Sequence, residues 1–454
     1  MDRWNGARVL VVGMARSGIS AARLLLDNGA IPLLYDSKNI SAFGDDLHDL
    51  VDTKCEFHLG EDPIKLLSNV DAVVISPGVP IDSKIVIQAK ESGLPVIGEL
   101  ELAFTFLKGQ SIAISGTNGK TTTTTLVGKI LENADKKTFV AGNIGYPLSK
   151  VSLEATEEDY SVIEVSSFQL ESIKTFHPYV AALLNISEDH LNRHYTMENY
   201  IALKQRLFEN QMPSDIAVIN YDDQVLRNMS KNIRSRVLFF SRKTTIENGA
   251  FVENGKIVFQ WDGIKKVICD VEEVLIPGPH NLENALAATV ITSVLSVPPT
   301  VIRHTLQSFS GVEHRIERVR VLDGVTYIND SKATNTDSTI KAVLAMTAPT
   351  VLLLGGYDKH TDFSPLCQEI VNSSNISHVV VLGETAKQIA TQLKEANYSN
   401  ITRAYSLEDA IEQARKIAVK GGNVLLSPAC ASFDMFNDFE HRGECFKTLV
   451  NQLA

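Results

Sequence analysis

The chain has 454 residues, which is more than one hydrophobic core supports and predicts about three domains. Its formal net charge of −11 excludes the broad basic surface that nucleic-acid binding requires, although local basic pockets can still hold anionic substrates. No apolar run approaches the roughly 18 residues that cross a bilayer, and no signal-peptide pattern opens the chain, so we expect a cytoplasmic protein without membrane insertion.

The first block of the chain alternates apolar strands and helices, as nucleotide-binding folds do. Strands are expected at residues 8–12, 31–35, 72–76 and 95–97. Gly13 and Gly18 match the outer glycines of a dinucleotide fingerprint, but Ala15 replaces the middle glycine that admits a pyrophosphate. Asp36 ends the second strand, where an acidic residue can meet a ribose hydroxyl. An NAD site stays open, and the pattern favours a modified pocket for a different nucleotide.

The second block begins near Glu99 and carries a phosphate-loop pattern at residues 115–121. An apolar run at 112–114 precedes a glycine loop, and Lys120 and Thr121 stand where a helix should begin. Backbone N–H groups and the helix N-terminus then face an anion, Lys120 adds a charge and Thr121 can hold Mg²⁺. Ile114 occupies the place of the first motif glycine, and an ordinary strand-to-helix turn is the alternative. The block therefore predicts a nucleoside triphosphate site.

Three charged or titratable residues follow within the same block. Glu164 lies inside the apolar strand 160–165, where a carboxylate needs a cation such as Mg²⁺. His190 follows the strand expected at 180–185, and its position fits a metal ligand and a structural histidine equally well. Lys204 falls on the apolar face of a helix expected at 197–209. Its stem either snorkels to solvent, or burial lowers its pKa and leaves a neutral amine open to modification.

The third block begins near Gly311 and repeats the strand–helix pattern. Strands are expected at four places: 325–328, 351–354, 378–382 and 423–426. Dense polar segments at 329–335 and 427–434 follow the first and last of these, where open α/β sheets place ligands. Arg315 and Lys359 add isolated cations in loops. Polar loops with capping residues are the alternative interpretation.

Taken in order, these motifs resemble the bacterial Mur ligases over essentially the whole chain. The segments shared with the family as a whole are 116–122, 164–170, 189–190, 200–204, 280–284 and 314–315. Segments 329–335 and 426–434 are more specific and resemble the branch of the family that adds D-glutamate. Another amino-acid ligase of the superfamily, including one like the folylpolyglutamate synthetases, is the nearest alternative. A nucleotide-binding regulator that uses ATP as a switch is a more distant one.

The resemblance implies three α/β domains and an amide ligase. The expected domains are a Rossmann-like UDP-binding domain at 1–98, a central phosphate-loop ATPase at 99–311, and a Rossmann-like ligase domain that binds the amino acid at 312–454. The implied reaction adds D-glutamate to UDP-N-acetylmuramoyl-L-alanine through an acyl phosphate, in peptidoglycan precursor synthesis. The implied cofactors are ATP and two Mg²⁺ ions, and we expect a monomer.

The resemblance also implies a role for each candidate site residue. Those implied in catalysis are Lys120, Glu164, His190, Lys204 and Lys332. Those implied to contact ATP are Gly116, Thr117, Asn118, Gly119, Lys120, Thr121, Thr122, Asn281, Asn284, Arg315 and Asp330. The implied metal ligands are Thr121, Glu164, His190 and Lys204, the last as a carbamate.

The implied substrate contacts divide between the two substrates. Those for the UDP-linked acceptor are Ala15, Arg16, Ser17, Asp36, Ser37, Lys38, Gly78, Asn143 and His190. Those for D-glutamate are Thr334, Lys359, Ser432, Phe433 and Phe439. Lys38 departs from the arginine that the family pattern leads us to expect, which keeps the charge but loses bidentate recognition.

Residues from the second and third blocks must meet around the ligands, because reacting atoms need to come within about 3–3.5 Å. We therefore expect an open ligand-free form and a closed liganded form, related by rotation of residues 312–454, which solution scattering with and without ligands would test. Gly311 is a candidate hinge, and a helix C-cap is its alternative role.

Overall fold

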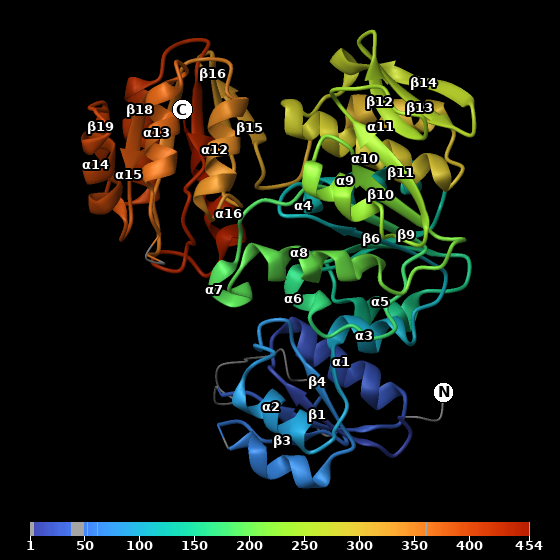
Figure 1. Cartoon of the computed structure of the whole chain (residues 1–454). Coiled ribbons are helices and arrows are strands. Elements are labelled where there is room, and N and C mark those ends of the chain that lie inside the picture. The colour runs from blue at the N-terminus through green and yellow to red at the C-terminus, as the bar shows by residue number, and fades with distance from the viewer. Residues whose placement is uncertain (1–3, 38–49, 52, 61, 359–360, 454) are drawn as a thin grey trace. The chain divides into compact units, whose positions relative to one another are not determined.

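The computed structural model describes residues 4–37, 50–51, 53–60, 62–358 and 361–453. It forms two compact units, one of residues 1–275 and 279–309 and the other of residues 276–278 and 310–454. The first unit holds two sheets and the second holds one, each flanked by helices (Figure 1). The expected three-domain α/β fold is confirmed. Among the described residues, no helix is both long and apolar enough to cross a membrane.

The N-terminal sheet is parallel and has the strand order β3-β2-β1-β4-β5. Its strands are β1 (Arg8–Val12), β2 (Ile31–Tyr35), β3 (Glu56–Phe57), β4 (Ala72–Ile75) and β5 (Val96–Gly98). The helical segments of this part are α1 (Arg16–Asp27), η3 (Pro63–Asn69) and α2 (Lys84–Glu91). Both faces of β1 are buried, since Val9 and Val11 belong to one core cluster and Leu10 and Val12 to another. That double burial explains the unbroken apolar run.

The central sheet has nine strands in the order β14-β13-β12-β11-β10-β9-β6-β8-β7. Its parallel strands include β6 (Gln110–Ser115), β7 (Thr138–Gly142), β8 (Tyr160–Glu164), β9 (Val180–Leu183), β10 (Ile216–Asn220) and β11 (Arg236–Ser241). Next to β11 lies a meander of β12 (Gly249–Glu253), β13 (Lys256–Trp261) and β14 (Ile264–Asp270), which was not predicted.

Helical segments connect and cover the central sheet (Figure 1). Those before β10 are α3 (Glu99–Phe104), α4 (Lys120–Asn133), α5 (Leu148–Glu154), α6 (Ser167–Leu170), α7 (Leu191–His194), α8 (Met197–Gln205) and η4 (Arg206–Phe208). Those after β10 are α9 (Gln224–Ser230), η5 (Val271–Glu273), α10 (Pro279–Val294) and α11 (Pro299–Ser308). The helix expected at 197–209 therefore changes to a 3₁₀ turn after Gln205. Its N-cap is Thr196, whose side chain accepts the Asn199 N–H.

The C-terminal sheet has six strands in the order β15-β16-β20-β17-β18-β19. They are β15 (Glu317–Leu322), β16 (Val325–Asn329), β17 (Thr350–Leu354), β18 (Ile376–Val381), β19 (Ile401–Arg403) and β20 (Asn423–Leu426), and only β15 runs antiparallel. Its helices are α12 (Thr336–Ala345), α13 (Ser364–Asn372), α14 (Ala386–Glu395), α15 (Leu407–Ile417) and α16 (Phe439–Gln452).

Strand order decides which loops meet. β6 lies between β8 and β9, with Ile114 opposite Glu164 and Ser115 opposite Leu183, so their carboxyl ends share one edge. In the C-terminal sheet Asn329 is opposite Leu426, which makes the two polar segments that follow β16 and β20 neighbours. Parallel sheets place ligands at such edges.

Gly311 does not cap a helix. Helix α11 ends at Ser308 with Phe309 as its C-cap, so the C-cap alternative for Gly311 is wrong. Its φ of +108° is one that glycine adopts readily and other residues rarely do. The hinge at this position stays a prediction.

Candidate active site

The phosphate loop has the conformation expected from its sequence. After β6, Gly116 and Gly119 adopt φ values of +153° and +82°, and α4 begins at Lys120 despite the five threonines that follow. Asn185, just beyond β9, accepts the Asn118 N–H at 2.8 Å and donates to the Asn118 carbonyl at 3.0 Å. Lys120 Nζ donates to the carbonyls of Gly116 (2.9 Å) and Thr117 (2.8 Å). The lysine therefore lies over the loop at the positive end of α4.

Glu164 provides an incompletely satisfied carboxylate at the end of β8. Its side chain is buried, and Oε1 accepts a hydrogen bond from Asn143 Nδ2 at 2.8 Å. Oε2 is buried and has no hydrogen-bond partner within the part of the chain that the structure describes. A buried carboxylate oxygen in this state is costly unless a cation meets it. The donor set thus fits the Mg²⁺ expected beside a phosphate loop.

Lys204 on α8 is 1 % exposed, so the snorkelling alternative is wrong. Its Nζ donates to Ser115 Oγ and to the Gly116 carbonyl, both at 3.0 Å. Burial, and next the charge of Lys120, hold the pKa of the Lys204 ammonium well below its usual value. The Lys204 amine therefore lies directly beneath the phosphate loop, where burial favours its neutral form.

His190 and His194 flank the short helix α7 and differ in environment. His190 has a φ of +54°, and its Nε2 lies 3.5 Å from Asp189 Oδ2 with the side chain half exposed. His194 is buried with its Nε2 2.9 Å from Ser167 Oγ, and burial lowers its pKa to about 4. Both rings contact Phe168, at centroid separations of 4.7 and 5.4 Å. The two histidines therefore do not form a metal pair, and His190 is the one with an accessible ring.

The described residues of the first domain that are expected to bind the UDP-linked acceptor gather at the carboxyl ends of β1, β2 and β4. The Met14 N–H donates to Asp36 Oδ2 at 2.8 Å, and Ser76 Oγ donates to the Gly13 carbonyl at 2.8 Å. A Cβ at Gly18 would lie 1.8 Å from the Gly13 carbonyl oxygen, so the helix α1 begins in close contact with the loop. The turn that holds Gly78 is next to this loop through Ser76. Lys38 lies outside the described residues.

In the C-terminal unit, Asp330 follows β16 and is nearly fully buried. Its Oδ2 accepts from Ser427 Oγ at 2.6 Å and its Oδ1 accepts the Ile316 N–H at 3.1 Å. Burial raises the pKa of Asp330 to about 6, against the lowering effects of the Ser427 hydrogen bond and of Arg315. The backbone N–H of Lys332 donates to the His314 carbonyl at 3.0 Å.

The described residues that are expected to bind D-glutamate follow two neighbouring strands, Thr334 after β16 and the others after β20. Ser432 is 2 % exposed, and its Oγ has no hydrogen-bond partner among the described residues, which fits a polar ligand. Phe439 begins α16, and Lys332 Nζ lies 5.3 Å from the centre of its ring. Thr334 donates its N–H to the Lys332 carbonyl, whereas Phe433 is 63 % exposed. Lys359 lies outside the described residues.

Comparison with known proteins assigns the chain to a family. Three family models match in order: the Mur ligase MurD-like N-terminal domain at residues 7–98, the Mur ligase middle domain at 114–292 and the Mur ligase glutamate ligase domain at 314–430. The UDP-N-acetylmuramoylalanine–D-glutamate ligase of Alkaliphilus oremlandii is 48 % identical over 449 residues, covering 98 % of each chain. This chain belongs to the Mur ligase family.

Further relatives and solved structures agree. The ligase of the same name from Thermoanaerobacter sp. is 45 % identical over 99 % of each chain. The UDP-N-acetylmuramate–alanine ligase MurC of Thermotoga maritima has the same fold, with a TM-score of 0.61 at 18 % identity over 98 % of this chain and 99 % of that one. The Thermotoga maritima MurF ligase in complex with ADP gives a TM-score of 0.59 at 18 % identity, over 99 % and 96 % of the two chains. Mur ligases are ATP-dependent amide ligases.

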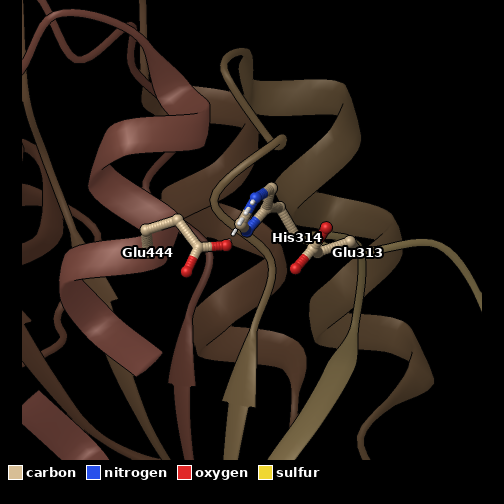
Figure 2. Close-up of side chains that lie close together, drawn as sticks. All are labelled: Glu313, His314 and Glu444. Atoms are coloured by element: carbon tan, nitrogen blue, oxygen red, sulfur yellow. Dashed lines mark ion pairs between the residues drawn. The ribbon is translucent and has the colours of Figure 1, made fainter. Parts of the chain in front are cut away.

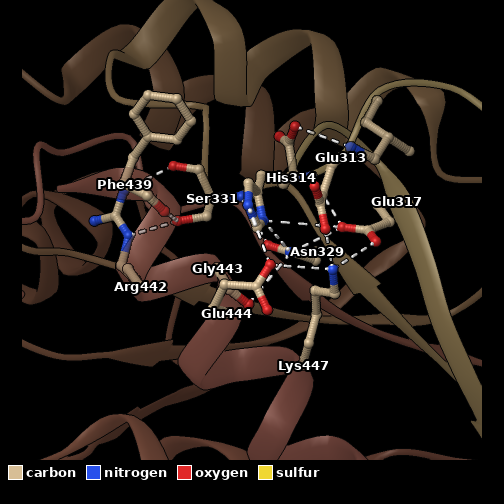
Figure 3. A network of polar contacts seen from close by, with 12 residues as sticks. Glu313, His314, Glu317, Asn329, Ser331, Phe439, Arg442, Gly443, Glu444 and Lys447 are labelled. Atoms are coloured by element: carbon tan, nitrogen blue, oxygen red, sulfur yellow. Dashed lines mark hydrogen bonds and ion pairs between the residues drawn. The ribbon is translucent and has the colours of Figure 1, made fainter. Parts of the chain in front are cut away.

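Sequence reasoning missed Arg442 in this Mur ligase. Its guanidinium is buried and donates to Ser331 Oγ (2.9 Å), to the Ser331 carbonyl (2.8 Å) and to the carbonyls of Cys430 (3.1 Å) and Ala431 (3.3 Å). It thereby ties together the two polar segments that follow β16 and β20. Figure 3 shows its contact with Ser331. Burial lowers the pKa of Arg442 to about 10, so the group keeps its charge at neutral pH.

Glu313, His314 and Glu444 converge closely enough to resemble a metal site (Figure 2). Lys447 already supplies a cation to this cluster: its Nζ pairs with Glu313, with Glu444 at 3.2 Å and with Glu317 at 3.3 Å (Figure 3). Asn329 Nδ2 donates a hydrogen bond to His314 Nδ1 at 2.9 Å, so this ring nitrogen is already engaged. The cluster is therefore an ion-pair network that holds α16 against the segment carrying Arg315.

Replacing Gly119 by alanine should weaken ATP binding by at least about ten-fold. The added Cβ would lie 2.3 Å from Asn284 Oδ1 and would push the Asn284 side chain away from the loop. Titration with ATP measures the effect. Gly263→Ala is the matched control, since its φ of +79° is similar and no atom lies within 4 Å of the added Cβ. That variant should lose stability alone. Equal ATP affinity in Gly119→Ala and the native protein would contradict the account.

Asp330 should give the free energy of unfolding a specific pH dependence. Its folded pKa of about 6 exceeds the usual 3.8, so its ionised form is destabilised in the fold. Protonated Asp330 therefore contributes to the free energy of unfolding, by at most about 3 kcal/mol relative to high pH. This contribution is fully present below pH 3.8 and is lost as the pH rises through 6. Asp330→Asn should therefore gain stability relative to the native protein between these pH values in denaturant titrations. A pH-independent difference between the two proteins would contradict this.

Proposed function

We propose that this chain joins D-glutamate to the carboxyl group of UDP-N-acetylmuramoyl-L-alanine, with conversion of ATP to ADP and phosphate, in peptidoglycan precursor synthesis. The observation that carries the proposal is the buried amine of Lys204, 3.0 Å from the Gly116 carbonyl of a phosphate loop. It is supported by 48 % identity to a D-glutamate ligase over 98 % of each chain. The domain bounds 1–98, 99–311 and 312–454, a cytoplasmic location and a monomeric state are parts of the same proposal.

The central site would activate the acceptor. Backbone N–H groups of the loop 116–119 and the ammonium of Lys120 would stabilise the charge on the transferred phosphoryl group. We assign to ATP binding two residues at the start of α4 and two that face it from α10: Thr121, Thr122, Asn281 and Asn284. The acceptor carboxylate would attack the γ-phosphoryl group, giving an acyl phosphate and ADP.

Lys204 would act as a carbamate. Its neutral amine can attack CO₂ and lose a proton, which turns a buried base into an anionic ligand. We propose two Mg²⁺ ions, which would be held by Thr121, Glu164, His190 and this carbamate. Bound Mg²⁺ would neutralise the phosphate oxygens as charge shifts toward ADP.

The remaining candidates would bind the substrates. For the acceptor we assign Ala15, Arg16, Ser17, Asp36, Ser37, Lys38 and Gly78 to its UDP part, and Asn143 and His190 to its muramoyl end. For D-glutamate we assign Thr334, Lys359, Ser432, Phe433 and Phe439. Arg315 and Asp330 would contact ATP, and Lys332 would lie near the transferred phosphate. The amine of D-glutamate would attack the acyl carbon and displace phosphate.

Phosphate release tests the proposal. With ATP and Mg²⁺ present, release should require both UDP-N-acetylmuramoyl-L-alanine and D-glutamate, and L-glutamate or diaminopimelate should not replace the latter. Preference for another amino acid, or for a folate acceptor, would identify a different ligase of the superfamily. Steady ATP turnover without any acceptor would contradict ligation altogether.

A further inference from the structure

Helix α7 and its two flanking residues form a strained segment, residues 190–195, between the central site and the first domain. His190 and Tyr195 have φ values of +54° and +67°, in the left-handed region that costs a non-glycine residue roughly 1 kcal/mol or more. Backbone conformations of this kind persist where surrounding contacts fix them. The contacts of this segment lead in two directions.

One set of contacts reaches the first domain. Tyr195 Oη donates to Asp82 Oδ2 at 2.5 Å, and Arg193 Nη2 donates to the Val79 carbonyl at 3.1 Å. Val79 in turn donates its N–H to the Ser76 carbonyl at 2.9 Å and closes a turn that contains Gly78. We call residues 76–82 the acceptor turn. The segment 190–195 thus contacts the acceptor turn at its middle, through Val79, and at its C-terminal end, through Asp82.

The other set of contacts leads to the central site. Glu171 accepts hydrogen bonds from Arg193 Nε at 3.0 Å and Nη2 at 2.5 Å, and both side chains are largely buried. The guanidinium lies 4.5 Å from the centre of the Phe168 ring, which is itself 4.7 Å from the His190 ring. A continuous path of contacts therefore joins the acceptor turn to His190.

The exposure of Tyr195 separates positioning from ordinary packing. The residue is 67 % exposed and buries little apolar area, so it adds little to the stability of the fold. Its hydroxyl nonetheless makes a short, charge-assisted bond across the boundary between the two domains. A strained, exposed tyrosine with one such bond is better suited to fixing a geometry than to stabilising a core.

We propose that Arg193 and Tyr195 are positioning residues that hold the acceptor turn in register with His190. They thereby couple two events: binding of the nucleotide at the acceptor turn and placement of the acceptor carboxyl group at the central site. This inference rests on the proposed function. Neither residue is catalytic, because Arg193 is engaged by Glu171 and Val79, and Tyr195 by Asp82.

The test removes the Tyr195–Asp82 bond from each side. Tyr195→Phe and Asp82→Asn should each raise the Kd of UDP-N-acetylmuramoyl-L-alanine, measured by calorimetry, and its KM by about five-fold. The KM for ATP and the melting temperature should not change. The double variant should resemble the single variants, because both remove one interaction. Tyr405→Phe is the matched control, since that tyrosine is 81 % exposed in the other unit, and it should behave like the native protein.

Arg193→Lys tests the path toward His190. A lysine keeps the charge but cannot contact Glu171 and Val79 through one fork, so the acceptor KM should rise and kcat should fall together. The proposal is overturned if Tyr195→Phe and Asp82→Asn leave acceptor binding unchanged, or if they weaken ATP and acceptor equally. Failure of the native protein to ligate D-glutamate would instead overturn the proposed function.

Discussion

Lys204→Ala is expected to abolish ligation, by at least about 10³-fold in kcat, while the protein stays folded. The loss would follow from removal of Nζ, the atom on which we propose that the carbamate forms. The fold should survive because each partner of Lys204 Nζ keeps another bond: Ser115 Oγ donates to Val165, and the Gly116 carbonyl accepts from Lys120. The truncated stem should cost about 1–3 kcal/mol of stability. Kinetics and denaturant titration measure the two effects.

Two further measurements distinguish a carbamate from a simple cation at this position. Short carboxylates such as acetate should restore part of the activity of Lys204→Ala, because they can occupy the space of the carbamate. With ¹³C-labelled bicarbonate, the native protein should show a carbamate carbon signal that the variant lacks. Lys231→Ala, which removes an exposed lysine, is the control. Native-like activity in Lys204→Ala at saturating Mg²⁺ would contradict the assignment.

Lys120→Ala should lower the rate of phosphoryl transfer by about 10²–10³-fold and weaken ATP binding. The lysine supplies a positive charge at the start of α4, where the phosphates are expected. Its loss has a second consequence. The charge of Lys120 helps to lower the pKa of Lys204, so the pKa of Lys204 should rise in the variant and its carbamylation should decrease.

The second consequence makes the two lysines a functional pair. The double variant Lys120→Ala, Lys204→Ala should be little worse than the more severe single variant, since both changes disable one assembly. Lys129→Ala is the control on the same helix, because Lys129 is half exposed and pairs only with Glu132 at 3.1 Å among the interactions described. Simple additivity of the two losses would show that the lysines act independently.

The buried parallel strands were predictable because they are encoded locally. The apolar runs at 8–12 and 423–426 coincide with β1 and β20. The rule that ligands bind at the carboxyl edge selected the polar segments 329–335 and 427–434 without any knowledge of strand order. The phosphate loop was predicted from its motif, and Glu164 from a carboxylate inside an apolar strand. Asn185, which bonds to the loop, was included in the strand expected at 180–185, whereas β9 ends at Leu183 and leaves Asn185 at the carboxyl edge.

The meander β12–β14 was missed although its signal was present. Asn254-Gly255 and Asp262-Gly263 are hairpin dipeptides, and all four residues have the positive φ that such turns need.

The burial of polar side chains by partners far away in the sequence could not be predicted in this way. Two of the hydrogen bonds of buried Arg442 go to Ser331, 111 residues away, and no local pattern distinguishes it from a surface arginine. The burial of Lys204 also depends on partners at least 88 residues away.

The most direct test of the account follows oxygen from the acceptor to phosphate. UDP-N-acetylmuramoyl-L-alanine labelled with ¹⁸O in its carboxyl group would be converted by the native protein in the presence of ATP, Mg²⁺ and D-glutamate. If the carboxylate attacks the γ-phosphoryl group and the amine then displaces phosphate, each phosphate released should carry one ¹⁸O, and the amide should keep the other. Formation of the amide with unlabelled phosphate would contradict an acyl-phosphate ligase.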